Sequence, residues 1–331
     1  MRIFIATPLF PPDIGGPAQY AVNLEKEFSQ LGHEVRVLSF SSVLYLPTGV
    51  RHIMYLLRAS VALFRSDVCI ILDTFSVALP TVLAGKLLRK KMIIRTGGDF
   101  LWESYVERTG DMALLLNFYA GNTSRWNLKE RVVFRLTRWL LHAVNIVVFS
   151  TEWQRSIWLG PYALAQVKTA IIENFYGEKE HAGDFTSKTY IGGVRDLKWK
   201  NVAQLKKSFA LAKQTCPEIT LDITHASYEQ FIEKMRTCYA VVLVSLGDIS
   251  PNIILDAVRL GKPFILTRET GLYEILKDVG VFVDPTSEKD IAEKIIWLSD
   301  GAHYREAQIK IHNFYKVHSW KKIAQEFLAL T

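Results

Sequence analysis

The stretch SLGDISPNIILDAVRLGKP, residues 245–263, decides the fold, because it reads as the end of a strand, one helix and the start of the next strand. Ser250 is a good N-cap, Pro251 suits the first helical position, and Gly261 stands where a helix stops. The helix between them is apolar almost all round, which predicts a buried helix. The order strand, helix, strand is the repeating unit of a parallel sheet.

The polar side chains of this helix form one narrow stripe. They are Asn252, Asp256 and Arg259, at positions i, i+4 and i+7. Unpaired N–H groups at the start of a buried helix can bind an anion such as a diphosphate, and a carboxylate one turn later can accept hydrogen bonds from ribose hydroxyls. In the alternative interpretation the stripe faces solvent and Asp248 is an ordinary loop aspartate.

Short apolar runs alternate with helical patterns along the whole chain, which is typical of two doubly wound parallel sheets that face a cleft. The runs are unbroken rather than alternating, as expected for strands covered on both faces. We predict strands at Arg2–Thr7, Glu34–Ser39, Val68–Leu72, Met92–Thr96, Asn145–Ser150, Lys168–Asn174, Tyr190–Gly193, Ile219–Ile223, Ala240–Ser245, Pro263–Thr267 and Val281–Val283. A helix over Pro17–Leu31 is closed by Gly32.

A polar stretch in the middle of the chain divides it into domains. The 331 residues suffice for two domains with separate cores. We assign residues 1–175 to a first Rossmann-like domain, 176–187 to a linker, 188–302 to a second such domain and 303–331 to terminal helices.

Composition excludes several classes of protein. With 49% hydrophobic and 22% charged residues the chain is not a disordered tail protein. Its apolar runs are too short for a signal peptide or a membrane span, and its three scattered cysteines form no disulfide framework. The cytoplasm is the expected compartment.

Charge is distributed unevenly. Residues 1–175 carry 19 Lys and Arg against 13 Asp and Glu, a net charge of +6, whereas the rest of the chain carries 21 against 20, or +1. Two basic stripes lie in the first half, Arg51, Arg58 and Arg65 beside Met54, Leu57 and Val61, and Arg131, Arg135 and Arg138 beside Trp139. They predict peripheral contact with an anionic membrane, or else two ordinary solvated helix faces.

Two glycine-containing loops follow predicted strands. YIGGVRDLKWKN, residues 190–201, ends a strand in glycines and then places cations before a helix, where they can meet a diphosphate leaving group. FPPDIGGP, residues 10–17, lets the backbone of Gly15 and Gly16 approach a ligand closely. The alternatives are a solvated basic loop and a simple Gly-Gly turn. The loop at residues 10–17 has neither the dinucleotide-binding nor the ATP-binding glycine pattern.

Together these motifs resemble glycosyltransferase family 4, the retaining GT-B enzymes. The family has two glutamates separated by seven residues in a similar loop and helix; Asp248 and Asp256 have this spacing here. The resemblance implies that Asp256 holds the donor ribose, that Asp248 approaches the donor sugar and that backbone N–H groups at Asn252 and Ile253 bind phosphate. Both acids are Asp rather than Glu and reach one methylene less far.

The resemblance also assigns other positions. Arg195 and Lys200 match a family Arg and Lys, although a shifted register places Lys198 in the second role, and Gly15 and Gly16 border the donor. Asp99 and Glu103 stand where many members place a histidine and are candidates for the sugar or acceptor pocket, or Asp99 caps a helix. Asn174 is a hinge or capping residue.

The domain roles follow from the same resemblance. The first domain binds the acceptor, the second binds the nucleotide-sugar, and the last helix crosses back to the first domain. The second domain is about one βα unit shorter than expected, and His225 or Tyr228 replaces a glycine loop in contacting the base.

The expected function is metal-independent, retaining transfer of a sugar, hexosyltransferase-like, from a nucleotide-sugar to a glycan or a lipid-linked acceptor. The chain has no Asp-x-Asp pair and no histidine pair at metal-ligand spacing, so we expect no metal, no cofactor and no nucleic-acid partner. The alternatives are a sugar-nucleotide epimerase or inverting transferase on the same fold, and a catalytically silent GT-B binding protein.

Overall fold

The computed structural model describes residues 1–13, 15–121, 123–180, 183–192, 197–223 and 227–331. The chain forms two compact units. The first contains Met1–Leu101, Asn122–Phe175 and His318–Thr331, and the second contains Trp102–Gly121 and Tyr176–Val317. The segment Trp102–Gly121 therefore belongs to the second unit, although it lies inside the residues 1–175 that the sequence assigns to the first domain.

The first unit is built on a six-stranded parallel sheet in the order β2-β1-β3-β4-β5-β6. Its strands are β1 (Arg2–Thr7), β2 (Glu34–Ser39), β3 (Val68–Ile71), β4 (Lys91–Arg95), β5 (Ile146–Phe149) and β6 (Thr169–Ile171). The four inner strands are largely buried because helices cover both faces of the sheet. The edge strands β2 and β6 are only partly buried.

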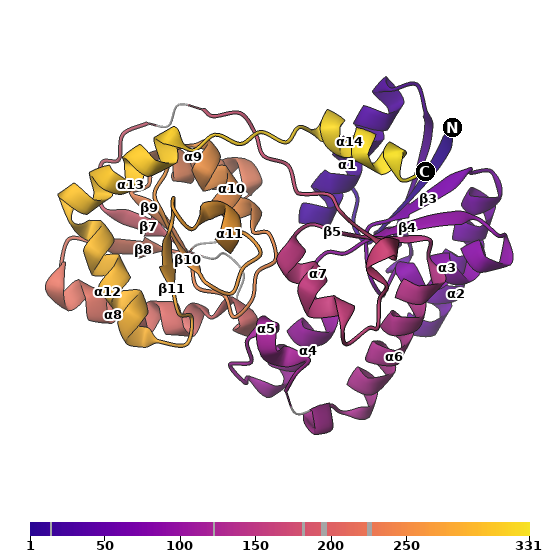
Figure 1. The fold of residues 1–331 in the computed structure, drawn as a ribbon, viewed down its shortest axis with the longest axis horizontal. Helices are drawn as coiled ribbons and strands as arrows, with labels where there is room; N and C mark the ends of the chain where they lie inside the picture. Colours follow the sequence, from indigo (N-terminus) through magenta and orange to yellow (C-terminus); the bar gives the residue numbers. More distant parts are fainter. Residues whose placement is uncertain (14, 122, 181–182, 193–196, 224–226) are drawn as a thin grey trace. The chain divides into compact units, whose positions relative to one another are not determined.

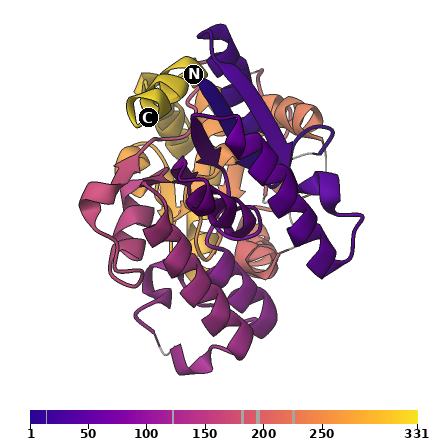
Figure 2. The same ribbon diagram turned by 90° about the vertical axis from the view of Figure 1, so that its right-hand side faces the viewer.

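One face of this sheet is covered by α1 (Gly16–Gln30) and α14 (Trp320–Ala329), whose apolar side chains share a core with β1, β3 and β4. Figure 1 shows α14 beside α1, and Tyr20 of α1 contacts both Trp320 and Phe327 of α14. The first and last residues of the chain thus both lie in this unit, and the two ends lie close together in Figures 1 and 2.

The opposite face carries a layer of three helices, α2 (Thr48–Phe64), α3 (Ala78–Leu87) and α6 (Leu128–Ala143). Helix α3 packs against both α2 and α6, so the three helices are neighbours. The remaining short elements of the unit are η1 (Phe40–Val43), η2 (Thr123–Arg125), α7 (Glu152–Leu159) and η3 (Gln166–Lys168).

The second unit has a five-stranded parallel sheet in the order β11-β10-β9-β7-β8. The strands are β7 (Thr189–Ile191), β8 (Thr220–Asp222), β9 (Ala240–Leu243), β10 (Phe264–Thr267) and β11 (Val281–Val283). One core lies under α8 (Val202–Thr215), α12 (Glu288–Ser299) and α13 (Gly301–Asn313). A second core lies under α9 (Tyr228–Thr237), α10 (Asn252–Arg259) and α11 (Tyr273–Leu276). The unit also contains η4 (Lys198–Lys200), α5 (Leu115–Phe118) and all but the first two residues of α4 (Phe100–Thr109).

All eleven predicted strands are present, with ends that differ by up to three residues, and the prediction of two parallel α/β sheets is confirmed. One predicted strand end, Gly193, lies outside the described residues. The terminating glycines are also confirmed, because Gly32 and Gly261 follow α1 and α10 with φ of 83° and 64°.

The predicted N-cap of α10 is wrong by one residue. The helix begins at Asn252, and its N-cap is Pro251, whose ψ of 114° is extended. Because Pro251 already accepts the first backbone bond, from the N–H of Ile254, Ser250 stands one position before the cap.

Candidate active site

The second sheet reverses its strand order between β7 and β9, and such a point is where ligands bind at the carboxyl ends of the strands. Lys200 follows β7, Asp248 follows β9 and Glu269 follows β10. The fold therefore brings three charged side chains from distant parts of the sequence to one edge of one sheet.

Lys200 and Asp248 form an ion pair across this switch point, with 2.5 Å between Nζ and Oδ2. Ser245 donates its hydroxyl to the same carboxylate oxygen at 3.2 Å. The ammonium also lies 4.3 Å from the centre of the Trp199 ring. Both charged side chains are mostly buried, so the pair is held in a fixed position.

The loop of Asp248 is fixed by its backbone to the loop after β10. The Asp248 N–H donates to the Glu269 carbonyl at 2.9 Å, and the Gly271 N–H donates to the Asp248 carbonyl at 3.3 Å. The Glu269 side chain is buried, accepts the Leu116 N–H at 3.3 Å and has a pKa raised by burial. A buried acid with a raised pKa beside a charged pair is typical of functional sites.

Residues 102–121 are attached to these same loops. The N–H of Leu115 donates to the carbonyl of Leu246 at 3.2 Å, and Lys198 donates to the carbonyl of Glu107 at 2.7 Å. Gly247 makes this approach possible, since a Cβ there would lie 2.5 Å from the Cβ of Leu115. Of the two candidate lysines, Lys200 is thus the one that meets Asp248.

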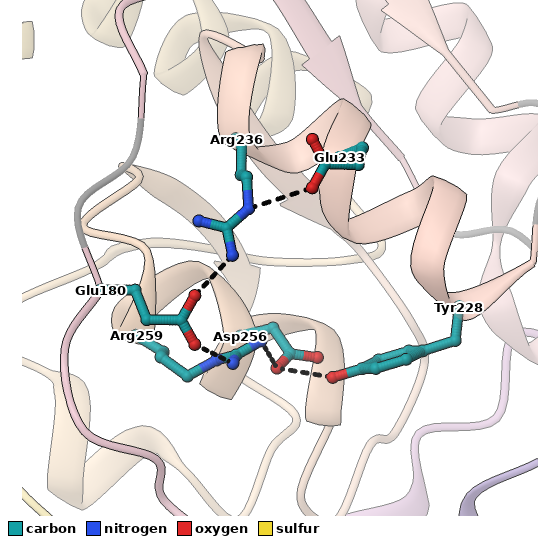
Figure 3. Close-up of polar contacts among 6 residues, drawn as sticks. All are labelled: Glu180, Tyr228, Glu233, Arg236, Asp256 and Arg259. Carbon is teal, nitrogen blue, oxygen red and sulfur yellow. Dashed lines mark hydrogen bonds and ion pairs between the residues drawn. The ribbon is translucent and has the colours of Figure 1, made fainter.

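Asp256 lies on α10 with two polar partners. Tyr228 donates its hydroxyl to Oδ1 at 3.2 Å, and Arg259 donates to the same oxygen at 3.1 Å (Figure 3). Burial raises the pKa of Asp256, and the cation of Arg259 opposes that shift. Burial and the neighbouring carboxylate raise the pKa of Tyr228 to about 12. Asp256 is therefore held in place by a hydroxyl and a guanidinium and retains a second carboxylate oxygen.

The polar contacts continue into the predicted linker. Glu180 accepts hydrogen bonds from both Arg259 and Arg236, the latter at 2.5 Å, and Arg236 also lies 3.3 Å from Glu233 (Figure 3). These bonds, that from Arg236 first, lower the pKa of Glu180. A chain of ionic contacts thus joins α9, α10 and the linker.

The sequence-predicted donor residues of the second unit divide into two groups. Lys200 and Asp248 meet, as described, and Asn252 and Ile253 form the first turn of the helix that carries Asp256. The N–H groups of that turn have no carbonyl one turn earlier within the helix. Arg195 and His225 lie outside the described residues.

The remaining predicted residues lie elsewhere. Gly15 is the N-cap of α1 and Gly16 its first residue, both in the first unit. Asp99, also in the first unit, is almost fully buried directly before α4 and accepts a hydrogen bond from the Trp158 indole at 2.9 Å. Glu103 lies in the first turn of α4, in the second unit. Their roles toward a sugar stay predictions.

Sequence reasoning missed Glu269 and Ser245 as candidate site residues. The available signal was position, because both lie at the carboxyl end of a strand, Ser245 after β9 and Glu269 after β10. Their side chains do not form a spaced motif with Lys200. Only the strand order of the sheet places all three on one edge.

Neither a metal site nor a membrane-spanning helix is found in the part of the chain that the structure describes. No group of three His, Cys, Asp or Glu side chains is arranged there to hold a metal ion. Likewise, none of the described helices combines the length and hydrophobicity that crossing a bilayer needs.

Comparison with known proteins gives matches at the level of structure. No family model matches the chain, and neither does any curated protein sequence. The chain is similar to sucrose-phosphate synthase from Thermosynechococcus elongatus, with a TM-score of 0.70 and 12% identity over 99% of this chain and 97% of that one. It is also similar to WaaG, a glycosyltransferase involved in lipopolysaccharide biosynthesis, with a TM-score of 0.68 and 10% identity over 100% and 99% of the chains.

A weaker similarity links the chain to the UDP-GlcNAc 2-epimerase of Methanocaldococcus jannaschii, whose structure holds UDP-GlcNAc and UDP. The TM-score is 0.53 and the identity 12%, over 99% of this chain and 98% of that one. At such identities the likeness concerns the fold. Since it extends over nearly the full length of each protein and both sheets match the prediction, the chain has the GT-B fold.

Proposed function

We propose that the protein is a glycosyltransferase that moves a sugar, of the hexose type, from a nucleotide-sugar donor to a glycan or lipid-linked acceptor, with retention at the transferred carbon and by family 4 chemistry. The observation that carries this proposal is the Lys200–Asp248 ion pair at the switch point of the second sheet. It sets a cation and a carboxylate side by side at the edge where such sheets bind ligands.

The two members of the pair have different proposed roles. The Lys200 ammonium, together with Arg195, stabilises negative charge on the leaving diphosphate, which grows as the bond to the sugar breaks. The Asp248 carboxylate accepts hydrogen bonds from the donor sugar. The first turn of α10, at Asn252 and Ile253, binds phosphate.

The proposed nucleoside end of the donor lies at Asp256. The carboxylate accepts hydrogen bonds from the ribose hydroxyls, and Tyr228, beside it, contacts the base. The backbone at Gly15 and Gly16 borders the donor, and Asp99 and Glu103 line the sugar or acceptor pocket. The proposed site of action is the cytoplasm, with peripheral contact at the inner face of an anionic membrane.

Nucleotide release from UDP-, GDP- and ADP-sugars, measured with and without candidate acceptors, tests the proposal. We expect release with one nucleotide class, and a large loss of turnover with smaller loss of nucleotide binding in Lys200→Met and in Arg195→Ala. Lys198→Met, which alters a lysine bonded to the Glu107 carbonyl, is the matched control. Failure to bind any of these nucleotides contradicts the proposal for UDP-, GDP- and ADP-sugar donors.

Two further readouts separate the alternatives. Nucleotide binding without release or sugar conversion identifies a silent binding protein, whereas an altered sugar on the nucleotide identifies an epimerase, the activity named for one structurally similar protein. The anomeric configuration of the product, read by nuclear magnetic resonance, decides between retention and inversion.

We also propose that transfer needs no divalent metal, because Lys200, Arg195 and a helix N-terminus supply the positive charge that a metal supplies in other enzymes. Excess chelator is expected to leave the rate of nucleotide release unchanged. Loss of activity with chelator, restored by magnesium, contradicts this part of the proposal.

A further inference from the structure

The layer of α2, α3 and α6 exposes an unusual row of apolar side chains. On α2, Ile53, Leu57, Val61 and Phe64 are 62%, 57%, 62% and 71% exposed. Their spacing of four, four and three residues puts them on one side of the helix. On the neighbouring α3, Leu87 is 84% exposed. A contiguous apolar row on a helix surface marks an interaction site rather than a scatter of single residues.

The same layer lacks exposed acidic side chains. Residues 35–66 and 74–98, which contain α2 and α3, have no Asp or Glu at all. The single acid of α6 is Glu130, which is buried and hydrogen-bonded within the capping box with Asn127. Among the described residues of this layer, all exposed charged side chains are therefore cationic.

Five exposed cations of the layer have no acidic partner among the described residues. They are Arg58 on α2, Arg65 directly after α2, Lys86 on α3, and Arg135 and Arg138 on α6. None of these five forms an ion pair with a described residue, and Arg58 makes only two long contacts, to the hydroxyl and carbonyl of Ser42. Arg58 and Arg65 each follow an exposed apolar residue of α2 and so flank the row along one side.

We infer that this face, formed by α2, α3 and α6, lies on the surface of an anionic lipid bilayer, with the row of α2 in the headgroup region and the cations against lipid phosphates. Apolar side chains flanked by unpaired cations are the composition of helices that bind at membrane interfaces. A nucleic acid satisfies the cations but not the apolar row. A second copy of the chain sets like charges against each other.

The inference deepens the membrane contact in the proposed function and does not depend on sugar transfer, because every residue in it belongs to the first unit. Its test is co-sedimentation of the full chain with vesicles of phosphatidylcholine alone or mixed with phosphatidylglycerol, at low salt. We expect strong binding to the mixed vesicles and weak binding to the neutral ones. Equal partitioning onto both overturns the inference.

Two double variants test the two components. Arg58→Glu with Arg65→Glu is expected to weaken binding to mixed vesicles by roughly thirtyfold or more, from the loss of two surface cations alone. Lys206→Glu with Lys207→Glu, exposed on α8, makes the same charge change in the second unit and is expected to leave binding nearly unchanged. Similar effects of the two pairs indicate a response to net charge only and overturn the inference.

Leu57→Ser with Val61→Ser tests the apolar row, and Ile309→Ser with Leu211→Ser is its control at exposed apolar positions of the second unit. We expect the first pair to reduce binding to the mixed vesicles and the control pair to leave it unchanged. If the first pair binds these vesicles as the parent does, the inference is overturned. The inference is also overturned if the protein without vesicles sediments as a dimer and Leu57→Ser with Val61→Ser makes that dimer dissociate. Nucleotide release without vesicles should be unchanged in all four variants, which separates failure of this inference from failure of the proposed reaction.

Discussion

At Asp256, burial and charge pairing act in opposite directions. Removal from water disfavours the carboxylate, whereas Arg259 and Tyr228 favour it by hydrogen bonding. Both partners bind the same oxygen, Oδ1, so the side chain has a defined orientation. This fixed orientation underlies the role in ribose binding that we propose for Asp256.

Asp256→Ala is expected to weaken nucleotide binding by roughly ten- to a hundredfold, the effect of losing a charge-assisted hydrogen bond of ~1.5–3 kcal/mol. Circular dichroism should show an intact fold, and calorimetric titration gives the affinity. Tyr228→Phe removes one bond to Asp256 but keeps its charge, so the decrease should be smaller. If Asp256→Ala binds nucleotide as tightly as the parent does, Asp256 does not bind the ribose and the polar stripe of α10 only faces solvent.

Glu180 gives a pH-dependent prediction, because Arg236 and Arg259 lower its pKa below the ordinary value of 4.5. The unfolded chain then binds more protons at Glu180 than the folded one, so its contribution to stability is full above about pH 4.5 and is lost as pH falls through the folded-state pKa. Glu180→Gln should therefore lower the free energy of unfolding at pH 7 and flatten its decrease in acid.

The control is Glu233→Gln, which alters the other carboxylate beside Arg236, an exposed one. Urea denaturation between pH 3 and pH 7 measures both variants. An unchanged acid slope for Glu180→Gln contradicts the role of the linker carboxylate.

At the scale of elements, the attachment of residues 102–121 to the second unit depends on Gly247. In Gly247→Ala the new methyl group would lie 2.5 Å from the Cβ of Leu115 and 3.1 Å from the Trp102 ring, so one side must move. Overpacking of this kind costs about 1–3 kcal/mol. We expect faster hydrogen exchange over residues 102–121.

Gly160→Ala is the matched control, because a Cβ at Gly160 meets nothing within 4 Å. It should unfold and exchange like the parent. Equal protection of residues 102–121 in Gly247→Ala and the parent would mean that this segment is held by other contacts.

The sequence predicted the secondary-structure elements better than it predicted the contacts between them. Most of the strands were found because a strand buried on both faces is an unbroken apolar run, although the edge strands β2, β6 and β8 are only partly buried. Helix α10 was found from its periodicity and from Gly261 at its end, whereas its N-cap was misplaced by one residue. The bonds of Glu180 to Arg259 and of Tyr228 to Asp256 were not found. Each joins residues from elements that only the folded sheet brings together, and a charged residue in a polar linker carries no local sign of its partner.

For the candidate site, sequence located two of the loops that the fold brings together. The loops after β7 and β9 were identified because glycines and charged residues follow apolar runs there, and Lys200 and Asp248 proved to meet. Glu269 was missed because it meets Asp248 through a backbone bond between the loops after β9 and β10, and a backbone contact leaves no pattern of side chains in the sequence.

At the scale of the whole molecule, α14 contributes to the core of the first unit from the end of the chain. Phe327 is fully buried among Tyr20, Leu24 and Phe28 of α1 and the central strands. Phe327→Ala should lower the stability of the first unit by about 3–5 kcal/mol. Hydrogen exchange in urea, resolved by peptide, should show early opening of α1 and the first sheet while β7–β11 stay protected.

Lys322→Ala, at an exposed position of the same helix, is the control and should behave as the parent does. Simultaneous destabilisation of both sheets by Phe327→Ala would show that the two units unfold as one.

The position of α14 also bears on synthesis. A ribosome adds residues 318–331 only after the other residues of the first unit and all of the second, so until then the part of α1 that contacts α14 has no cover. The second unit, whose residues from Tyr176 to Val317 are continuous, emerges and can fold while the first waits. The first unit is thus begun before the second but completed after it, and in that interval part of its apolar surface is open to solvent.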